Sequence, residues 1–324
     1  MIRDLSTPAP AISVLTPAHD VARFIGQAVD SVLAQSFPDW EMLVVDDGSR
    51  DGTAEQVTAR RDPRLRLLRQ ANQGVSAARS RAMAEARGEA VLFLDADDWL
   101  APDALERLAA ALATLPQAVG AHGGYSVMAE DAGPDDPPIR RLVGPFPSGD
   151  LLERLLVRNL FVNGGHLLLR RDALLRAGPF LSHLRYGEDW EYWIRLALQG
   201  PFAAVEGSEP LLYVRERSGS AYRRMAHDPA AFAPAMVAIY GNPALADRLG
   251  PARLDRMRRL AEAENAWIIG REMIRHGDRA AGLERLRASV AGAPSAKRAV
   301  LLAAAHAMPL LPRPLRGPFA PYPG

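Results

Sequence analysis

The 324-residue chain contains no cysteine. Disulfides, a thiol nucleophile, Cys-ligated zinc and iron–sulfur clusters are therefore excluded, and a reducing compartment fits the composition. No uninterrupted apolar run reaches the roughly 20 residues that a bilayer-spanning helix needs, and the N-terminus lacks the basic-then-apolar pattern of a secretory signal. We therefore expect a soluble, cytoplasmic protein.

Lysine is almost absent, because Lys297 is the only lysine among the 39 basic residues. Genome composition can produce such Arg-rich chains, so we give it no functional weight. The net charge of +1 is unevenly placed, since residues 251–324 hold 13 Arg or Lys against 6 Asp or Glu. A basic region of this kind can contact an anionic membrane. We expect either peripheral contact with the inner face of the membrane or an ordinary solvated surface, and no nucleic-acid partner.

Short apolar runs alternate with amphipathic stretches over the first 110 residues. The apolar runs predict strands at 12–15, 42–45, 65–68 and 90–94. The 3.6-residue spacing predicts helices at 21–33, 51–61, 75–87 and 102–112. Asp20 is placed to cap the first of these helices. The alternation predicts an α/β fold with a doubly wound, mostly parallel sheet.

The pattern is less regular from residue 119 onward. It predicts strands at 119–128, 161–170 and 211–214, helices at 172–176 and 189–199, and a polar, proline-rich loop at 130–138. Beyond Tyr222 the chain reads as helical, with helices near 251–275 and 278–290 that form a hairpin. We place a domain boundary near residue 225, between an α/β domain at 1–225 and a helical C-terminal region at 226–324.

Polar residues gather where three of the predicted parallel strands end. They are Thr16 to Asp20 after the first strand, Asp46 to Ser49 after the second, and Asp95 to Asp98 after the fourth. Ligands of an open α/β sheet bind beyond the carboxyl ends of its strands. Carboxylates crowded on one edge repel one another, so they need a cation or hydrogen-bond donors. Mg²⁺ or Mn²⁺ is the natural partner of carboxylates combined with phosphate oxygens.

Four stretches of the sequence together carry a resemblance to a known family. They read ISVLTPAHD, VVDDGSRDGT, ANQGVSAARSRAMAEARGEAVLFLDADD and GEDWEYWIRLA. In this order they resemble the inverting family 2 glycosyltransferases with the GT-A fold, over roughly residues 11–220. The resemblance implies a nucleotide-binding half at about 11–115, an acceptor-binding half at about 116–225, and a helical C-terminal extension.

The resemblance also implies a donor site. Asp95, Ala96 and Asp97 resemble the DxD motif, in which the first carboxylate approaches the ribose and the second binds Mn²⁺ or Mg²⁺ on the donor's diphosphate. Asp97 and Asp95 are therefore the expected metal ligands. The other expected nucleotide contacts are Pro17, Ala18 and His19 against the base, Asp47 and secondarily Asp46 at the base, and Asn72 and Arg79 on the nucleotide or pyrophosphate. His19 replaces a common Tyr, and its imidazole can still stack.

The GED stretch resembles the catalytic segment of the family. In an inverting transfer a base must stand across the pocket from the nucleotide. The resemblance places that base at Asp189, with Glu188 as the neighbour to be distinguished from it. Both lie at the start of a predicted helix, where the helix dipole favours ionised carboxylates. Trp190 and Trp193 are expected to line the acceptor pocket.

One departure from the family pattern concerns the diphosphate. Many relatives carry a histidine shortly after the last strand, near the metal or the diphosphate, whereas this chain reads YVRERSGS from Tyr213. That histidine is absent. We expect Arg215 or Arg217 to bind the diphosphate oxygens in its place. The sequence therefore assigns no third protein ligand to the metal.

Each motif also has an ordinary structural explanation. Asp98 or Asp103 can cap the helix that follows, and the Asp46–Asp47 pair can form an Asx turn. Arg79 can be a plain salt-bridged arginine, and the two tryptophans of the GED stretch can belong to the core. His166, beside two glycines, is expected to be structural.

Three functions are compatible with these residues. The first is an enzyme that moves a sugar from a nucleoside diphosphate donor, expected to be a UDP-sugar, to a hydroxyl of a glycan or lipid-linked acceptor in cell-envelope or exopolysaccharide synthesis. The second is a catalytically inactive nucleotide-sugar-binding partner of a polysaccharide assembly complex. A nucleotidyltransferase ranks last, because no glycine- and lysine-rich loop follows the first strand.

Overall fold

The computed structural model describes residues 9–217, 228, 230, 232–275 and 278–307 of the chain. They divide into two compact units. An α/β unit contains residues 9–151 and Phe161–Arg217, and a helical unit contains Leu152–Leu160 together with the described residues from 228 onward. The division after Arg217 lies close to the boundary expected near residue 225, but the inclusion of Leu152–Leu160 in the helical unit was not anticipated.

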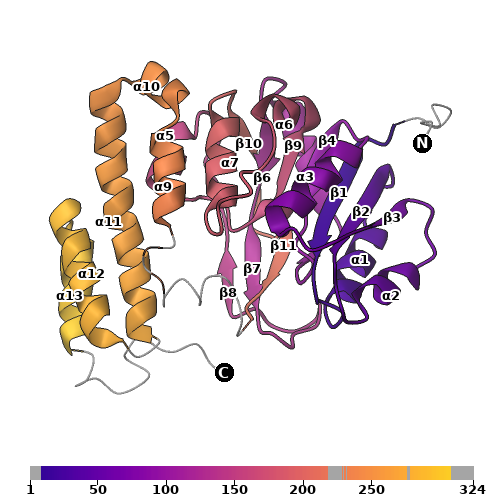
Figure 1. The fold of residues 1–324 in the computed structure, drawn as a ribbon, viewed down its shortest axis with the longest axis horizontal. Coiled ribbons are helices and arrows are strands. Elements are labelled where there is room, and N and C mark those ends of the chain that lie inside the picture. Colours follow the sequence, from indigo (N-terminus) through magenta and orange to yellow (C-terminus); the bar gives the residue numbers. More distant parts are fainter. Residues whose placement is uncertain (1–8, 218–227, 229, 231, 276–277, 308–324) are drawn as a thin grey trace. The chain divides into compact units, whose positions relative to one another are not determined.

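A seven-stranded sheet forms the centre of the α/β unit (Figure 1). Its strands in spatial order are β10 (Phe202–Ala204), β6 (Gly120–His122), β9 (Leu167–Arg170), β4 (Ala90–Phe93), β1 (Ile12–Ala18), β2 (Trp40–Asp47) and β3 (Leu65–Gln70). Only β9 runs antiparallel to its neighbours among these strands; the other adjacent pairs are parallel. The doubly wound, mostly parallel sheet predicted from the sequence is confirmed.

Helices cover this sheet because their apolar side chains recur on one face. They are α1 (Ile25–Leu33), α2 (Thr53–Thr58), α3 (Val75–Glu85), α4 (Ala104–Thr114), α6 (Arg171–Ala177) and α7 (Glu188–Ala197). In α1 the apolar positions Ile25, Val29 and Val32 are fully buried and join the core that includes Val14 of β1 and Leu92 of β4. Burial of each such side chain stabilises the fold by about 1.5–3 kcal/mol.

A second, four-stranded sheet lies within the same unit. Its order is β5 (Trp99–Leu100), β11 (Leu212–Arg215), β7 (Tyr125–Met128) and β8 (Arg140–Leu142). β11 pairs antiparallel with β5, with Tyr213 opposite Trp99, and parallel with β7. Because β5 directly follows the Asp95–Asp98 segment, this pairing brings the end of β11 next to the acidic cluster.

Two predicted strands are shorter than expected. The predicted strand 119–128 divides into β6 and β7, which belong to different sheets, at Gly123 and Gly124. A Cβ atom on Gly123 would lie 2.5 Å from the buried Leu211 side chain. Glycine therefore lets the chain pass from one sheet to the other without displacing Leu211. Within the predicted strand 161–170, only the residues of β9 form a strand. The 3₁₀ turn η1 (Gly164–His166) precedes it, and the Asn163 side chain accepts a hydrogen bond from Gly165 N.

The helix cap predicted at Asp20 is wrong. Helix α1 begins at Ile25, and Phe24 stands at the N-cap position without a side-chain hydrogen bond. Asp20 has a left-handed backbone (φ 48°), its carboxylate accepts a hydrogen bond from Arg50 N at 2.7 Å, and its own N–H donates to Ser49 Oγ. Asp20 therefore joins the loop after β1 to the loop after β2.

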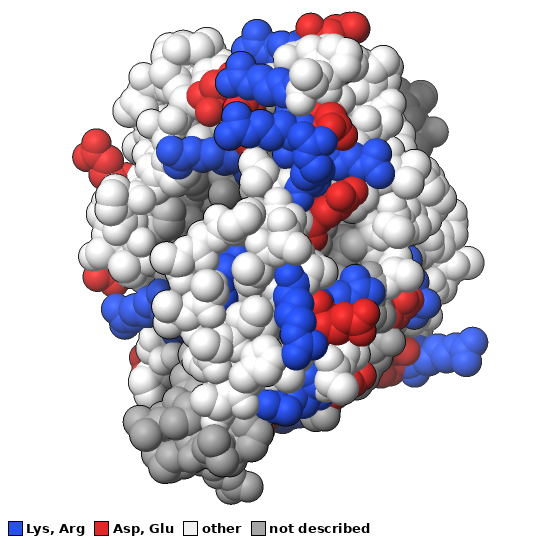
Figure 2. Space-filling view, turned by 90° about the vertical axis from the view of Figure 1, so that its left-hand side faces the viewer, with Lys and Arg blue, Asp and Glu red and all other residues white. Residues whose placement is uncertain are grey.

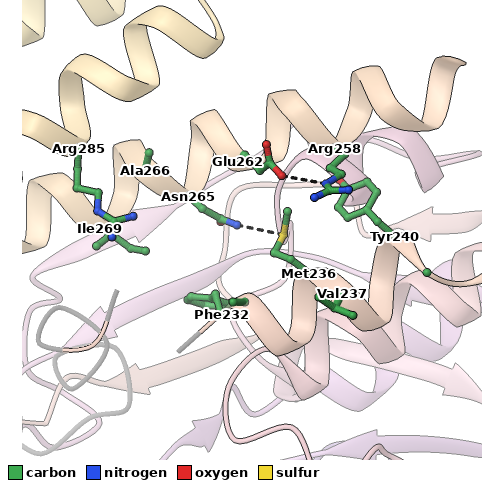
Figure 3. A pocket seen from close by; sticks show the side chains of 12 residues that line it. Phe232, Met236, Val237, Tyr240, Arg258, Glu262, Asn265, Ala266, Ile269 and Arg285 are labelled. Carbon is green, nitrogen blue, oxygen red and sulfur yellow. Dashed lines mark hydrogen bonds and ion pairs between the residues drawn. The ribbon is translucent and has the colours of Figure 1, made fainter. Parts of the chain in front are cut away.

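The helical unit contains α5 (Leu152–Val157), α9 (Ala233–Tyr240), α10 (Pro243–Leu249), α11 (Pro251–Arg275), α12 (Arg279–Gly292) and α13 (Ala296–Ala307). Helices α11 and α12 form the expected hairpin and approach closely at two glycines: a Cβ on Gly270 would lie 2.8 Å from the carbonyl oxygen of Gly282. Between α9 and α11 lies a pocket of about 510 Å³, lined mainly by apolar side chains such as Phe232 and Ile269 (Figure 3).

Figure 2 shows Lys and Arg side chains gathered on one face of the molecule with acidic side chains among them. In α11, exposed Arg258 pairs with Glu262 at 2.9 Å, and exposed Arg259 pairs with Asp255. Peripheral membrane contact stays a prediction. In the part of the chain that the structure describes, no helix combines the length and the apolar character needed to span a bilayer.

Candidate active site

The strand register brings the polar loop residues to one edge of the large sheet. Ala18 lies opposite Asp46 in the β1–β2 pair, and Leu15 lies opposite Phe93 in the β1–β4 pair. The segments that follow β1, β2 and β4 therefore leave the sheet on the same side. All residues of the site described below belong to the α/β unit.

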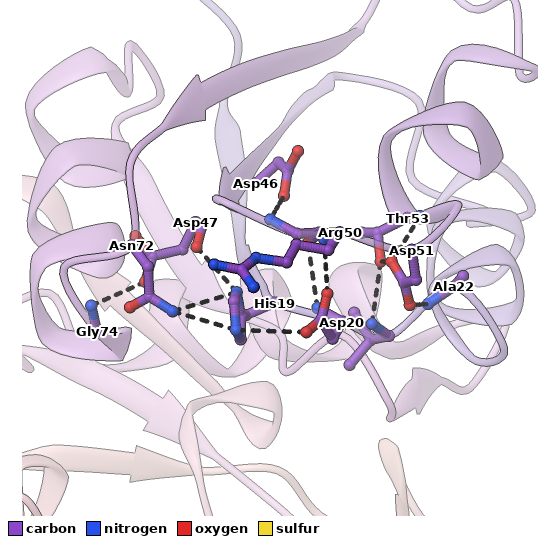
Figure 4. A network of polar contacts seen from close by, with 12 residues as sticks. His19, Asp20, Ala22, Asp46, Asp47, Arg50, Asp51, Thr53, Asn72 and Gly74 are labelled. Carbon is purple, nitrogen blue, oxygen red and sulfur yellow. Dashed lines mark hydrogen bonds and ion pairs between the residues drawn. The ribbon is translucent and has the colours of Figure 1, made fainter.

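One group of the predicted nucleotide contacts forms a connected network (Figure 4). His19 Nδ1 lies 2.9 Å from the backbone carbonyl oxygen of Asp47, and Asn72 Nδ2 lies 3.1 Å from His19 Nε2. Carbonyl oxygens only accept, so Nδ1 donates and Nε2 accepts from the amide. The ring of His19 keeps 42% of its side-chain surface exposed. The structure thus brings His19, Asp47 and Asn72 together, with an imidazole that a ligand can reach.

Asp47 holds the loop that carries Asn72. Its carboxylate is only 4% exposed and accepts hydrogen bonds from Gln73 N at 2.9 Å and Gly74 N at 2.8 Å. The Gln70 side chain also donates to it, at 2.7 Å. This arrangement gives Asp47 a positioning role in the protein, and its contact with a nucleobase stays a prediction.

Asp46 is also buried, with 1% exposure, and accepts hydrogen bonds from Ser49 N at 2.9 Å and Arg69 Nε at 3.2 Å. This bond to Ser49 spans three residues, whereas an Asx turn joins an Asp side chain to the backbone N–H two residues on, so it is not the Asx turn considered from the sequence. Pro17 is partly exposed, whereas Ala18 is buried in the sheet. Of these three residues only Pro17 has surface that a ligand can contact, and the contact itself stays a prediction.

The acidic segment after β4 holds two partly exposed carboxylates and one buried carboxylate. Asp95 and Asp97 keep 29% and 25% of their side chains exposed, while Ala96 between them is buried. Asp98 is 3% exposed and accepts hydrogen bonds from Asn163 Nδ2 at 2.6 Å and Arg215 N at 2.8 Å. Asp98 therefore joins β11 to this segment and does not cap α4.

An arginine pairs with each of these two partly exposed carboxylates. Asp95 Oδ1 lies 2.9 Å from Arg79 Nη2, and Asp97 Oδ2 lies 2.8 Å from Arg217 Nη1. Burial raises the pKa of Asp97, and the nearby charge of Asp95 raises it further, although Arg217 opposes both. Burial and the charge of Asp95 both disfavour the ionised form of Asp97, and a cation bound beside it would favour that form.

The donor set around Asp97 fits a divalent ion only in combination with a ligand. Within the described residues, no three or more His, Asp or Glu side chains form a group that could hold a metal ion. Two partly exposed carboxylates, at Asp95 and Asp97, are nevertheless the usual protein contribution to Mg²⁺ sites that phosphate oxygens complete. The residues present fit an ion that binds together with a diphosphate.

The GED segment is connected to the acidic segment through Arg79, which pairs with both Asp95 and Glu188. Gly187 adopts a left-handed conformation (φ 75°) and α7 starts directly after it. Glu188 accepts a hydrogen bond from Arg79 Nη1 at 3.1 Å, and Asp189 Oδ1 accepts one from Trp190 N at 2.6 Å. Burial and the charge of Glu188 raise the pKa of Asp189 to about 7, against the opposing effect of Arg79. A carboxylate with a pKa near the working pH is suited to general base catalysis.

The acceptor-lining role expected for Trp190 and Trp193 is not compatible with their burial. Their exposed fractions are 2% and 1%. The Trp193 ring packs against Phe93, Phe161 and Phe180, with ring centroids 6.3 to 6.4 Å apart. A helix that starts at the sheet edge and lies on the sheet must turn its large rings inward, so both tryptophans belong to the core.

The diphosphate role expected for Arg215 is likewise not supported. Arg215 is 6% exposed, and burial lowers its pKa. Its guanidinium donates to the carbonyl oxygens of Asp97, Glu130 and Ala132 and to the Gln27 side chain, at 2.5 to 3.1 Å. All of its nitrogens are therefore used within the protein. Arg217 remains the diphosphate candidate, because 31% of its side chain is exposed beside Asp97.

The contrast between the two arginines leads to a stability prediction. Replacing Arg215 by Met should lower the free energy of unfolding by about 3 kcal/mol or more, because several buried carbonyl groups lose their donor. Urea unfolding followed by tryptophan fluorescence measures this change. The matched variant Arg217→Met should alter stability by less than about 1 kcal/mol, as expected for a partly exposed pair. Equal destabilisation by both substitutions would contradict the assignment of Arg215 to the interior.

The sheet order, the second small sheet and the carboxylates at the sheet edge together define the GT-A class of nucleotide-sugar-binding folds. The sequence model described as "Glycosyl transferase family 2" matches residues 13–177, about half of the chain. The chain therefore belongs to glycosyltransferase family 2.

Individual relatives support this placement. The chain is 39% identical over 130 residues to the putative teichuronic acid biosynthesis glycosyltransferase TuaG of Bacillus subtilis, covering 39% of this chain and 51% of the relative. It spans about half or less of the length of several such curated relatives, for example 29% of the uncharacterized glycosyltransferase EpsJ of the same organism at 38% identity.

Solved structures share the fold over most of the chain. The crystal structure of S. aureus TarS 1–349 matches with a TM-score of 0.63 and 18% identity over 92% of this chain and 87% of that one, and it has also been solved with UDP and with UDP-GlcNAc. The mannosyltransferase PcManGT from Pyrobaculum calidifontis, in complex with GDP-Man and Mn²⁺, matches with a TM-score of 0.60 and 22% identity over 94% and 82%.

Proposed function

We propose that the protein transfers a sugar, with inversion, from a nucleoside diphosphate donor to a hydroxyl group of an acceptor. The observation that carries this proposal is the link between two halves of the site: Arg79 contacts both Asp95, beside the expected diphosphate position, and Glu188, next to the candidate base Asp189. A donor held at Asp95 and Asp97 would therefore lie within one site together with that base.

A UDP-sugar is the proposed donor, supported by the UDP complexes of TarS. PcManGT was solved with GDP-Man, so the experiment below compares donors that carry uracil with donors that carry guanine. The name of TuaG supports an acceptor in cell-envelope polysaccharide synthesis, either a glycan or a lipid-linked sugar. Asp95 and Asp97 would hold a divalent ion, which supplies Lewis-acid stabilisation of the departing diphosphate.

The chemistry assigned to this chain's residues is a single displacement. The acceptor oxygen forms a bond to the anomeric carbon while the bond from that carbon to the diphosphate oxygen breaks, and its electron pair leaves with the diphosphate. Asp189 takes the acceptor's proton, so it must be ionised when the acceptor binds. Arg217, paired with Asp97 in this structure, is placed to stabilise the negative charge that develops on the diphosphate.

The proposed base leads to a pH prediction. Because the pKa of Asp189 is raised to about 7, its ionised fraction falls below that value and approaches a tenfold decrease for each further pH unit. We expect kcat/KM for the donor to rise with pH and to reach a plateau above about pH 8. Initial rates from about pH 5.5 to about pH 9 in constant ionic strength measure this profile. A flat profile across that range would contradict the assignment of Asp189 as the base.

The direct test of the proposed function is sugar transfer itself. Purified protein is incubated with Mn²⁺, a panel of UDP- and GDP-sugars and short glycan or lipid-linked acceptors, and released nucleoside diphosphate is measured together with the glycosylated product. Donor-dependent release with an inverted linkage is the expected result. Tight binding of a nucleotide-sugar without release under any of these conditions would instead favour the inactive binding partner.

A further inference from the structure

The carboxylate proposed to hold a divalent ion already has a cationic partner within the protein. Arg217 Nη1 lies 2.8 Å from Asp97 Oδ2, and 31% of the arginine side chain and 25% of the aspartate side chain are exposed. Asp97 is therefore accessible to solvent ions and paired with a guanidinium at the same time. A divalent ion that binds this carboxylate must compete with Arg217, because both cations are attracted by the same negative charge.

The ring of Phe24 holds Arg217 beside this carboxylate. The guanidinium carbon of Arg217 lies 4.9 Å from the centre of the ring, which belongs to a buried side chain. Arg215 and Arg23 approach the same ring at 5.0 Å and 5.3 Å, so positive charge is concentrated around it. Arg215 is bonded to backbone carbonyl groups, and Arg23 is paired with a different aspartate. An ion that binds at Asp97 is therefore opposed by like charge, and Arg217 is in direct contact with the carboxylate that the ion needs.

A diphosphate changes this competition. Its oxygens complete the coordination of a divalent ion held by carboxylates, and they are also strong acceptors for a guanidinium. When an ion takes the negative charge of Asp97, the pair between Asp97 and Arg217 is weakened. The diphosphate then offers Arg217 a second anion, so that both cations have a negative partner and their mutual repulsion is offset.

Resting on the proposed function, we propose that Arg217 exchanges one anion for another when the donor binds: it pairs with Asp97 in the absence of metal, and with the donor's diphosphate once a divalent ion occupies Asp97. The metal alone is then opposed by Arg217, and the nucleotide relieves that opposition. Metal and nucleotide therefore bind cooperatively, and each tightens the binding of the other by the same factor.

The first test measures binding of Mn²⁺ without nucleotide, by electron paramagnetic resonance of the free ion. Arg217→Met removes the charge that competes for Asp97. An exposed ion pair is worth up to about fivefold in affinity, and repulsion between the ion and a nearby cation in water adds a factor of similar size. The Kd for Mn²⁺ alone should therefore fall about 3- to 30-fold in Arg217→Met. A tighter site for the ion is not what loss of a merely structural residue would produce.

The second test measures binding of UDP by calorimetric titration. In the presence of Mn²⁺ the Kd of Arg217→Met for UDP should rise at least about tenfold, because a charged hydrogen bond to the diphosphate is lost. Without metal, the Kd for UDP should change less than about threefold, since Arg217 then pairs with Asp97 in the wild type. The factor by which Mn²⁺ and UDP tighten each other should thus fall at least about tenfold.

Two further variants separate direct contact from general charge. Arg217→Lys keeps a positive charge at the same position, so its Kd for Mn²⁺ alone should stay within about threefold of the wild type. Arg23→Met is the matched control, because Arg23 also approaches Phe24 but pairs with Asp131. At about 0.15 M salt its Kd for Mn²⁺ alone should change less than about twofold.

The exchange of partners is also followed directly, by ¹⁵N NMR of the arginine side chains with diamagnetic Mg²⁺. The signal of Arg217 is identified by its absence from Arg217→Met. It should stay in place when UDP is added without metal and move when UDP and Mg²⁺ are added together. A signal that stays in place under both conditions would overturn the exchange.

The binding results can also contradict the proposal. A Kd for Mn²⁺ alone that is unchanged or raised in Arg217→Met would mean that Arg217 does not compete with the ion. Equal binding of Mn²⁺ by the wild type, Arg217→Met and Asp97→Ala would place the ion away from Asp97 and would also overturn the exchange. These measurements need no turnover: absence of sugar transfer by the wild type refutes the proposed function, while the Kd values still decide the role of Arg217.

Discussion

Asp189→Asn should lower kcat by about 10²- to 10⁴-fold, the range that loss of a general base produces. The amide keeps the shape of the carboxylate and its bond to Trp190 N, but it cannot take a proton from the acceptor. The Kd for UDP with Mn²⁺ should change less than about threefold, because the proposed role of Asp189 is toward the acceptor and not toward the nucleotide. Steady-state kinetics combined with calorimetric titration of UDP separates these two quantities.

The control for this prediction lies on another helix. Asp172 also stands in the first turn of its helix, α6, but 66% of its side chain is exposed beside Arg176. Asp172→Asn should leave kcat unchanged. Glu188→Gln should retain turnover, with its acidic limb shifted downward because a negative neighbour of Asp189 is removed. Full loss of kcat in Glu188→Gln with activity retained in Asp189→Asn would move the base to Glu188.

Asp97→Ala should weaken binding of UDP in the presence of Mn²⁺ by at least about 10- to 100-fold, the loss that even second-layer partners of a metal cause. The carboxylate of Asp97 is partly exposed and lies near that of Asp95, and its removal leaves Asp95 alone to hold the ion. Binding of UDP without metal should weaken little, and Arg217, released from its partner, can then contact the phosphates directly. Titration of UDP with Mn²⁺ and with EDTA measures both conditions.

Asp103→Ala is the matched control for this substitution. Asp103 stands just after the same acidic segment, 54% exposed and paired only weakly with Arg107 at 3.5 Å. Its removal should leave UDP affinity unchanged in both conditions. If Asp97→Ala binds UDP with Mn²⁺ as tightly as the wild type, the metal does not bind at Asp97 and the donor site must be placed elsewhere.

Much of the α/β unit could be predicted from residue order because its signals are local. A buried parallel strand needs an unbroken apolar run, and runs such as 42–45 and 90–94 are visible without a structure. Parallel strands also end on a common edge, so Asp46 and Asp95 could be placed at one site from their positions directly after those runs. The strands β5, β8 and β10, of two or three residues each, are too short for a local pattern to distinguish them from loops, and the sequence did not predict them.

The roles of individual side chains were harder to predict, because direction is set by packing. The pair Arg215 and Arg217 shows this: two residues apart at the end of β11, one is buried among carbonyl groups and the other is exposed beside Asp97. Trp190 and Trp193 follow the acidic pair of the GED stretch closely, yet their rings point into the core. No spacing rule separates these outcomes, since both directions satisfy the same local pattern.

The sequence by itself determined the class of fold, the family and the edge of the sheet where the acidic residues meet, because each depends on periodicity and on motifs that are contiguous in the chain. Only the tertiary structure decided that Leu152–Leu160 packs in the helical unit, that Asp98 is buried while Asp97 is partly exposed, and that Arg79 pairs with Glu188, 109 positions further along the chain. The physical reason is that burial and ion pairing depend on which distant segments come into contact, and a residue's own neighbours in the chain do not encode those contacts.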